Sequence, residues 1–464
     1  MDEIIFMNKA FLFTFFASCL FSAQNVVQRL KGRVQTFLNS KAMSAAHLSF
    51  YVSDDKGNLV YEYQGSKGLS TASTQKIFTA ITALETLGED YRFTTSAAYS
   101  GKIEDGVLKG DLYLASNGDP SLGSWRYEGY KPEDFKRKFI EAVHKLKLKA
   151  IEGRVLVDDS YFDFQSVPGG WPWNDIGNYY GAGVYGVNWN ENQFDVRFSK
   201  SGEIKNIKYN PPYVQWVNDV SVKGSSDQSI IYTAPFSEVA YINGSIPEGK
   251  ESVVSGAMPN PPLFLAKEVE KWLEEDGVEV SGEATSFSLE KISTGEKLKV
   301  QKSNIFFNYN SPSLDKIVYW FLRKSVNLYG EALVKTFSKL GGKDSSHEEG
   351  VQFLKNFWLK KGIASEMIHF KDGSGLSPQN YVSAKAEVQA LLYAQDKRYF
   401  SSFYEALPLY NGMKMKSGTI SGCKAYAGYH TAKNGKKYVY SIMVNNYSGG
   451  NINAELYKIL DILK

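Results

Sequence analysis

Residues 71–76 read Thr-Ala-Ser-Thr-Gln-Lys, and they are followed by apolar side chains that recur every three or four residues, at Ile77, Ala80, Ile81, Leu84 and Leu87. This recurrence predicts a helix with one buried face. Ser73 then stands where the helix begins, and Lys76 lies one turn further along the same side. A serine hydroxyl becomes an effective nucleophile when a base takes its proton, and a lysine with a lowered pKa can be that base. The stretch therefore predicts a nucleophilic serine beside its base.

The spacing Ser-x-x-Lys is a weak signal by itself, because the chain contains it elsewhere as well. Residues 53–56 read as the turn of a hairpin that spans 48–63, and residues 421–424 fall in a turn before another strand. A serine at the start of a helix is also commonly only its cap. The assignment of Ser73 therefore depends on motifs further along the chain.

Length and composition predict a protein of several domains and give no indication of a nucleic-acid partner, a metal site or a cofactor. A chain of 464 residues is long enough for two or three domains, and its 43% of hydrophobic residues can supply their cores. The net charge of +3 gives no indication of a nucleic-acid partner. The five histidines are scattered and no Cys/His cluster is present, so the sequence predicts neither a metal site nor a cofactor.

The N-terminal residues predict export. A short basic region at Asn8-Lys9 precedes an apolar run over 10–21, which is too short for an ordinary membrane-spanning helix. The pattern predicts a signal peptide over 1–23, cleaved after Ala23, and a periplasmic protein. Attachment to the membrane surface through a lipid on Cys19 is the alternative, although the apolar run continues beyond that residue.

The distribution of strand and helix patterns predicts an α+β protein with an insertion. A hairpin near the start, three strands near the end and a helix at each terminus predict one antiparallel sheet flanked by helices. Short strands and two helices fill the middle of the chain. We therefore expect a first part of the main domain at 24–91, inserted β-rich domains at 92–300, and the second part of the main domain at 301–464.

Two further motifs come after Ser73 along the chain. Ser325-Val326-Asn327 comes after a helical pattern, and Lys416-Ser417-Gly418-Thr419 ends a predicted strand. In the latter, the lysine would attract a carboxylate, the hydroxyl would hydrogen-bond it, and the glycine would let substrate backbone lie close to the strand. The N–H groups of Ser73 and Thr419 could together stabilise an oxyanion. A similar stretch at 200–202 is followed by Glu203, which suits a carboxylate poorly.

Taken together, the three motifs in this order resemble the signature of penicillin-binding proteins and serine β-lactamases. The long insertion between the first two is similar to that of class C low-molecular-mass penicillin-binding proteins of the penicillin-binding protein 4 type. Other stretches that resemble this family are 110–114, 118–120, 171–175 and 372–377. One departure is Ser417, where the family more often has threonine. The resemblance implies a transpeptidase-like domain with a five-stranded antiparallel sheet.

The resemblance also implies roles for the motif residues. Ser73 would be the acylated nucleophile and Lys76 its general base. Ser325 would relay a proton, and Asn327 would hold the substrate amide and Lys76. The terminal carboxylate of the substrate would be bound by Lys416, Ser417, Gly418 and Thr419.

Activity and partners are implied by the same resemblance. The family members are D-alanyl-D-alanine carboxypeptidases and endopeptidases that act on peptidoglycan stem peptides and cross-links and are inhibited by β-lactams. Their inserted domain provides an acidic and aromatic wall for the free amine of diaminopimelate. Trp171, Asp175 and Tyr180 are the candidates here, with Asn174 and Tyr179 close enough to leave the register open. Ordinary packing of an aromatic loop is the alternative for this cluster.

Two other functions fit parts of the pattern. A serine β-lactamase would use the same acylation with fast deacylation, but the sequence gives no specific cue for a second base, and the long insertion disfavours it. A catalytically silent cell-wall-binding protein would not need Ser73, Lys76 and Lys416, all of which are present. The sequence therefore favours the carboxypeptidase and endopeptidase activity.

Overall fold

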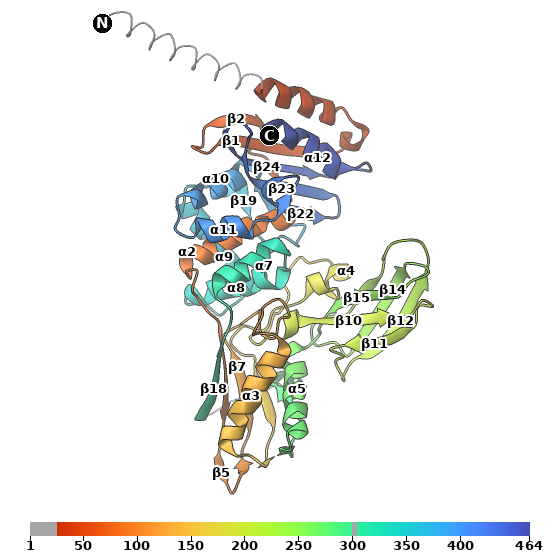
Figure 1. Ribbon diagram of the computed structural model, residues 1–464, viewed down its shortest axis with the longest axis vertical. Coiled ribbons are helices and arrows are strands. Elements are labelled where there is room, and N and C mark those ends of the chain that lie inside the picture. The colour runs from red at the N-terminus through yellow and green to blue at the C-terminus, as the bar shows by residue number, and fades with distance from the viewer. Residues whose placement is uncertain (1–25, 299–303) are drawn as a thin grey trace, which may run out of the picture. The chain divides into compact units, whose positions relative to one another are not determined.

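The computed structural model describes residues 26–298 and 304–464 (Figure 1). The predicted signal peptide over 1–23, with Cys19 and Ala23, lies outside the described residues. The chain divides into two compact units. The first contains the described residues up to Ile81 together with Trp358–Phe370 and Pro378–Lys464, and the second contains Thr82–Phe357 and Lys371–Ser377. The domain boundaries at 91/92 and 300/301 stay a prediction.

The first unit is built on a six-stranded antiparallel sheet in the order β2-β1-β24-β23-β22-β21. Its strands are β1 (His47–Asp54), β2 (Leu59–Tyr63), β21 (Leu409–Tyr410), β22 (Met413–Ile420), β23 (Cys423–Thr431) and β24 (Lys437–Asn445). The pairing of β1 with β24 joins the two ends of the chain, as predicted. The sixth strand, β21, was not predicted, because two residues are too few to show an alternating pattern.

Helices cover both faces of this sheet, because successive side chains of a strand point to opposite sides. Ile442 of β24 packs in a cluster with Leu456 of α12 (Ile452–Leu460) and with Leu30 of the helix over 26–38. The next residue, Met443, packs with Ala384 of α10 (Ala384–Gln395). The predicted flanking helices are therefore confirmed (Figure 1).

Smaller elements complete the first unit. They are η1 (Lys41–Met43), β3 (Gly68–Leu69), η2 (Ala72–Gln75), α2 (Lys76–Thr86), η5 (Ser365–Met367), β19 (Ile368–His369), β20 (Tyr381–Ser383), α11 (Phe400–Ala406) and η6 (Asp461–Leu463). The strands β19, β20 and β3 form a separate small sheet. The helix α2 continues into the second unit after Ile81.

The described residues of the second unit form four sheets, in the orders β17-β9-β7-β4-β18, β16-β8-β6-β5, β11-β10-β15 and β12-β14-β13. Their strands are β4 (Thr94–Tyr99), β5 (Lys102–Glu104), β6 (Val107–Lys109), β7 (Leu112–Ser116), β8 (Ala150–Ile151), β9 (Val155–Asp158), β10 (Gln193–Phe198), β11 (Ile204–Lys208), β12 (Gln215–Val222), β13 (Ile230–Tyr232), β14 (Val239–Ile246), β15 (Ser252–Ala257), β16 (Glu279–Val280), β17 (Thr285–Ser286) and β18 (Asn304–Asn310). The strand β12 was not predicted, because most of its side chains are exposed and give no clear apolar alternation.

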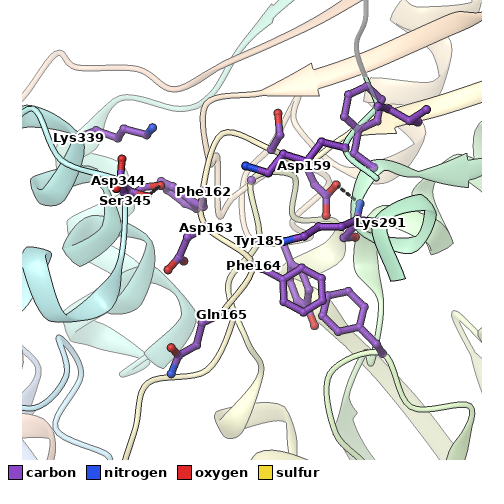
Figure 2. Close-up of a pocket in the computed structure, with 17 residues that line it drawn as sticks. Asp159, Phe162, Asp163, Phe164, Gln165, Tyr185, Lys291, Lys339, Asp344 and Ser345 are labelled. Atoms are coloured by element: carbon purple, nitrogen blue, oxygen red, sulfur yellow. Dashed lines mark hydrogen bonds between the residues drawn. The ribbon is translucent and has the colours of Figure 1, made fainter. Parts of the chain in front are cut away.

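The helices of the second unit are α3 (Pro132–Leu146), α4 (Trp173–Ile176), α5 (Pro261–Glu275), α6 (Phe287–Thr294), α7 (Leu314–Arg323) and α8 (Asn327–Leu340), with the short turns η3 (Tyr179–Gly181) and η4 (Asn190–Asn192). The helix α9 (His347–Lys360) ends in the first unit. Aromatic side chains join α3, α5 and β18, where Phe135 contacts Trp272 and Phe307. The unit also has a cavity of about 850 Å³ (Figure 2).

Candidate functional site

Ser73 lies on a 3₁₀ turn rather than at the start of an α-helix. The turn η2 precedes α2, which begins at Lys76, so the predicted helix start was three residues too early. Ala72 has a φ of 45°, and the N–H of Thr74 donates to the carbonyl of Thr71 at 3.3 Å. A 3₁₀ turn repeats every three residues, so Ser73 and Lys76 still share one side. We call Thr71–Lys76 the nucleophile turn.

The two side chains of the first motif are in direct contact. Lys76 Nζ donates to Ser73 Oγ at 3.0 Å, and the Lys76 side chain is fully buried. The Ser-x-x-Lys stretches at 53–56 and 421–424 differ, because Lys56 is exposed in a hairpin turn and Lys424 donates to Thr419. This contact is the arrangement that a serine nucleophile and its base require.

Gly418 on β22 allows the strand to approach the nucleophile turn. A Cβ atom at this position would lie 2.3 Å from the carbonyl oxygen of Thr71 and 3.0 Å from the backbone nitrogen of Ser73. The first of these distances is too short for any side chain. The sequence suggested that this glycine makes room for substrate, whereas the structure shows that it first makes room for the backbone of Thr71 and Ser73.

Lys416 places a buried amino group beside the nucleophile turn. Its side chain is 1% exposed, and its Nζ donates to the carbonyl of Ser417 at 2.8 Å. Burial, followed by the charges of Lys76 and Lys424, holds the pKa of Lys416 well below its usual value. Within the described residues no carboxylate forms an ion pair with it. The amino group is therefore open to an anionic ligand, whose negative charge would favour the ammonium form.

Lys424 lies beside the third motif, and the sequence analysis did not identify it. It pairs across the sheet with Thr419, and its Nζ donates to Thr419 Oγ1 at 2.7 Å. Burial lowers the pKa of Lys424 as well. The sequence contained a signal for this contact, because a two-residue turn at 421–422 places residues 419 and 424 opposite each other in a hairpin. Lys424 therefore adds a second ammonium group beside the hydroxyl of Thr419.

Glu387 of α10 lies beneath the nucleophile turn and was also missed. Its carboxyl oxygens lie 2.6 Å from Thr74 Oγ1 and 2.7 Å from Ser441 Oγ. The Thr74 hydroxyl is also 2.9 Å from the carbonyl of Thr71, and it has one proton to donate. Burial raises the pKa of Glu387 to about 7. A protonated carboxyl that donates to Thr74, while Thr74 donates to Thr71, satisfies all of these groups.

Replacing Glu387 with glutamine is expected to make thermal stability less dependent on pH. The folded carboxyl has a pKa of about 7, above its ordinary 4.5, so its stabilising contribution is present below pH 4.5 and is lost as the pH rises to 7. The full loss is about 3 kcal/mol at 1.36 kcal/mol per pKa unit. Glutamine keeps one donor and one acceptor but does not titrate. The Tm of Glu387→Gln minus that of wild type should therefore increase by several degrees from pH 4.5 to pH 8.

Glu405→Gln provides the matched control for this measurement, because the Glu405 side chain is 68% exposed. Its Tm should follow that of wild type at every pH. A difference between Glu387→Gln and wild type that is the same at pH 4.5 and pH 8 would show that Glu387 is not protonated in the folded protein.

The second motif lies in the second unit. Ser325 has a φ of 58°, which is uncommon for a residue with a side chain, and it precedes α8. Asn327 is the first residue of α8 and is 8% exposed, and its Nδ2 donates to the carbonyl of Tyr180 at 2.7 Å. The structure therefore brings Asn327 of the second motif together with one residue of the predicted amine-binding wall.

Two of the three wall candidates contact each other. Tyr180 donates its hydroxyl proton to Asp175 Oδ1 at 3.3 Å, and burial raises the pKa of Asp175. Trp171 has another partner, because its Nε1 donates to Asp372 Oδ2 at 2.8 Å and its side chain is buried. The sequence left Asn174 and Tyr179 as alternatives to Asp175 and Tyr180. In the structure Tyr179 is exposed, and Asn174 accepts a hydrogen bond through its backbone carbonyl.

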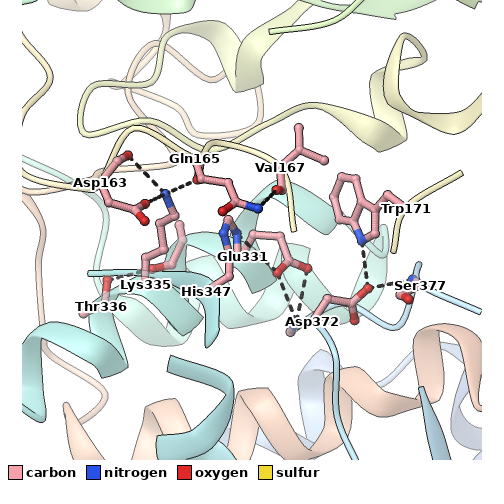
Figure 3. Close-up of polar contacts among 12 residues, drawn as sticks. Asp163, Gln165, Val167, Trp171, Glu331, Lys335, Thr336, His347, Asp372 and Ser377 are labelled. Atoms are coloured by element: carbon pink, nitrogen blue, oxygen red, sulfur yellow. Dashed lines mark hydrogen bonds and ion pairs between the residues drawn. The ribbon is translucent and has the colours of Figure 1, made fainter. Parts of the chain in front are cut away.

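Asp372 organises the turn that begins after Lys371 (Figure 3). Its carboxylate accepts hydrogen bonds from the N–H groups of Gly375 at 2.7 Å and Ser377 at 2.6 Å, besides that of Trp171. The N–H of Gly373 donates to the buried carboxylate of Glu331 on α8. The stretch 372–377 thus ties the loop of Trp171 to the helix that begins at Asn327.

The site residues therefore form two groups. Within the first unit, the structure brings together Ser73, Lys76, Lys416, Ser417, Gly418 and Thr419, with Lys424 and Glu387 in addition. Within the second unit, it brings together Asn327, Tyr180 and Asp175, with Ser325 and Trp171 elsewhere in the same unit.

Neither a metal site nor a membrane span is found in the part of the chain that the structure describes. Over 26–298 and 304–464, no three His, Cys, Asp or Glu side chains gather where they could hold a metal ion. Over the same residues, no helix is both long and apolar enough to cross a membrane.

Comparisons with known proteins cover nearly the whole chain. The model of the D-Ala-D-Ala carboxypeptidase 3 (S13) family matches residues 30–461. D-alanyl-D-alanine carboxypeptidase DacB of Haemophilus influenzae is 24% identical over 454 residues, which cover 90% of this chain and 89% of that protein. D-alanyl-D-alanine carboxypeptidase of an Actinomadura species is 26% identical over 456 residues, which cover 90% of this chain and 81% of that protein.

Solved structures give the same fold. The crystal structure of penicillin-binding protein 4 from Haemophilus influenzae matches with a TM-score of 0.77 and 21% identity, covering 95% of this chain and 99% of that one. A second structure of that protein, in complex with a novel β-lactam, matches with a TM-score of 0.71 and 21% identity, covering 94% of this chain and 97% of that one. The predicted α+β fold of the penicillin-binding type with inserted domains is therefore confirmed.

Proposed function

The chain belongs to the D-Ala-D-Ala carboxypeptidase 3 (S13) family, and we propose that it hydrolyses peptidoglycan stem peptides and cross-links with Ser73 as its nucleophile. The observation that carries this assignment is the 3.0 Å contact between Lys76 Nζ and Ser73 Oγ. The Haemophilus and Actinomadura relatives are themselves D-alanyl-D-alanine carboxypeptidases. Family membership and this contact support the same reaction.

The proposed reaction has two steps. Lys76 accepts the proton of Ser73 while Oγ attacks the carbonyl of the penultimate D-alanine, and the C–N bond then breaks. The leaving amine takes a proton, which we assign to relay through Ser325. A water molecule then attacks the acyl-enzyme, with Lys76 again as the base, and releases the shortened peptide. The N–H groups of Ser73 and Thr419 are the proposed oxyanion donors.

The carboxylate of the terminal D-alanine is proposed to bind at the end of β22. Thr419 and Ser417 provide hydroxyl groups there, and Lys416 and Lys424 provide positive charge. A carboxylate gains more from such charged hydrogen bonds than a neutral group does. Peptides that end in an amide should therefore be poor substrates.

The remaining roles rest on the family resemblance. We propose that Asn327 holds the substrate amide and that Asp175 and Tyr180 recognise the free amine of diaminopimelate, with Trp171 supporting their loop. The hydrogen bond of Asn327 to Tyr180 supports a connection between these two functions. β-Lactams are proposed as inhibitors, because the similar Haemophilus protein has been solved with one bound.

The experiment that tests the function is digestion of purified peptidoglycan fragments. Cross-linked muropeptide dimers and monomeric pentapeptides should both be shortened by the wild-type protein and by neither after penicillin treatment. The appearance of monomers from dimers would show endopeptidase activity, and loss of one alanine from pentapeptides would show carboxypeptidase activity. An enzyme that hydrolyses penicillin rapidly and leaves both substrates intact would instead be a β-lactamase.

The cellular location of the protein follows from its proposed substrate. We propose that the protein is exported to the periplasm by the segment 1–23, since peptidoglycan lies outside the cytoplasmic membrane, and that it is either free there or held at the membrane surface through Cys19. Cell fractionation of the full chain and of Cys19→Ala would distinguish a lipid anchor from a free protein.

Replacing Asp175 with alanine is expected to weaken hydrolysis only of substrates with a free diaminopimelate amine. Loss of a hydrogen bond to a charged group is worth about 1.5–3 kcal/mol, which is roughly 10–200-fold in kcat/KM. The measurement is the hydrolysis of a stem pentapeptide and of its N-acetylated form by both proteins.

The acetylated peptide should be a poor substrate for wild type and should be affected little by Asp175→Ala. Benzylpenicillin, which has no such amine, should acylate both proteins alike. An equal loss with all three compounds would mean that Asp175 acts only in folding of the loop, and the amine would then have to be recognised elsewhere.

A further inference from the structure

The cavity of the second unit contains none of the residues assigned to the reaction. It has a volume of about 850 Å³ and is lined by the segment 159–165 after β9, by α6, by the end of α8 and by the turn at 344–345 (Figure 2). Cavities that bind small ligands have volumes of about 300–1,000 Å³. The cavity is therefore large enough for a ligand of several linked rings or residues.

One part of the lining is aromatic. Phe162 and Tyr185 are buried, whereas Phe164 is 45% exposed and stacks on Phe236 with ring centroids 4.7 Å apart. The stacked pair holds the Phe164 ring in place, so its orientation is fixed before a ligand arrives. Lys291 Nζ also lies over this ring, so a sugar ring can stack there when the ammonium group turns to a carboxylate of the same ligand.

The other part of the lining is cationic. Lys291, Lys297 and Lys339 line the cavity, and none of them has a carboxylate partner among the residues that the structure describes. Lys291 Nζ lies 4.9 Å from the centre of the Phe164 ring, and Lys339 Nζ lies 5.2 Å from that of Tyr161. Contacts with aromatic rings orient these ammonium groups and leave their charge uncompensated.

The acidic groups of the cavity do not cancel this charge. Asp163 is paired with the buried Lys335, whose Nζ lies 2.6 Å from Asp163 Oδ1 (Figure 3). Asp159 is buried and accepts the N–H of Ser288, and burial raises the pKa of this carboxyl to about 6. Asp344 is exposed. The cavity thus offers more positive than negative charge to a ligand, with carboxyl groups left to accept hydrogen bonds from hydroxyls.

We propose that this cavity is a second binding site for a glycopeptide fragment of peptidoglycan, which packs sugar rings on Phe164 and places peptide carboxylates on Lys291 and Lys339. The ligand class rests on the proposed function, which supplies peptidoglycan as the polymer that the enzyme meets. A ligand with both sugar rings and carboxylates is the one that uses the aromatic and the cationic lining together. Binding here would hold the enzyme on the polymer while stem peptides are hydrolysed.

The test is calorimetric titration with a disaccharide tetrapeptide, which has no terminal D-Ala-D-Ala bond, into full-length protein already acylated by penicillin. Occupation of Ser73 by the drug removes binding at the catalytic serine from the signal. Lys291→Gln combined with Lys339→Gln should weaken binding by at least about 10-fold, because two charged hydrogen bonds are lost. Phe164→Ala should weaken it too, and Lys102→Gln, on the exposed strand β5, should leave it unchanged.

An uncharged disaccharide and inorganic phosphate test which groups of the glycopeptide the cavity binds. The uncharged disaccharide of N-acetylglucosamine should bind at least about 10-fold more weakly than the glycopeptide, since it lacks the charged hydrogen bonds. Inorganic phosphate should not displace the glycopeptide at millimolar concentration. Glycopeptide binding that is the same in the double lysine variant and in wild type would overturn the proposal. Displacement by phosphate would overturn the glycopeptide assignment and leave a simple anion site.

Acylation by penicillin separates this proposal from the proposed function. The cavity variants should form the penicilloyl ester at the wild-type rate, because none of the substituted residues belongs to the motifs. A wild-type protein that forms no ester would refute the function itself. A protein that is acylated normally but whose glycopeptide binding does not depend on Lys291, Lys339 or Phe164 would refute only the second site.

Discussion

Ser73→Ala is expected to abolish covalent labelling of the protein by penicillin. A β-lactam presents its carbonyl as the D-Ala-D-Ala bond of a stem peptide does, and the ester can form only on an activated hydroxyl. Ser73 has that activation from Lys76 Nζ at 3.0 Å. Removal of a catalytic serine can lower turnover by about 10⁶-fold. Intact-mass measurement of both proteins after incubation with benzylpenicillin should show the added mass only on wild type.

Two of the other Ser-x-x-Lys serines, Ser53 and Ser421, are the controls. Ser53→Ala and Ser421→Ala should be labelled as fast as wild type, since Ser53 lies in β1 and Ser421 lies in the turn after β22. Cys423 should not compete for the drug, because its thiol is buried and burial raises its pKa to about 12. Equal labelling of Ser73→Ala and wild type would remove Ser73 as nucleophile and return Ser53 and Ser421 to consideration.

Lys76 and Lys416 are expected to differ in what their loss does to acylation. Lys76→Ala removes the base and should reduce acylation to the level of Ser73→Ala. Lys416→Ala removes carboxylate attraction and a positive charge beside Lys76, which corresponds to a loss of about 10²–10³-fold, so slow labelling should remain. The measurement is the second-order rate of penicillin acylation for each variant.

Lys76→Met is a second variant without the base. Its side chain fills the same buried space as the aliphatic part of lysine, so the protein should fold even if Lys76→Ala does not. Both Lys76 variants should have the far-ultraviolet circular dichroism of wild type. Unimpaired acylation by a folded Lys76 variant would contradict its role as base. Acylation of Lys416→Ala at the wild-type rate would mean that the carboxylate is held by Thr419 and Lys424 alone.

Features that depend on spacing along the chain were predictable. Alternating strands near both ends predicted the antiparallel sheet, and the pairing of Phe50 with Ile442 confirms that the ends meet in it. The three-residue spacing of Ser73 and Lys76 predicted their contact even though the local backbone is a 3₁₀ turn and not the first turn of an α-helix. The roles of Ser325, Asn327 and the wall residues stay predictions.

Features that depend on contacts between distant segments were not predictable. Glu387 is 313 positions from its partner Thr74, and a single acidic residue in a helix usually faces solvent. The sequence around Trp171 predicts a residue of the amine-binding wall, but its Nε1 donates a hydrogen bond to Asp372, 201 positions later. Only the folded chain shows such pairs, since neither partner carries a local pattern that points to the other.

The close approach of Gly418 to the nucleophile turn limits how such an enzyme can escape its inhibitors. Drug resistance by crowding a binding cleft requires positions where a larger side chain obstructs the drug more than the natural substrate. A Cβ atom at residue 418 would meet the carbonyl of Thr71 before it met any ligand, and it would displace the backbone of Ser73. Mutation at this position would damage turnover of the cell-wall substrate together with acylation by the drug. Selection for resistance is therefore expected to leave this glycine unchanged and to act on residues outside its contact with the turn.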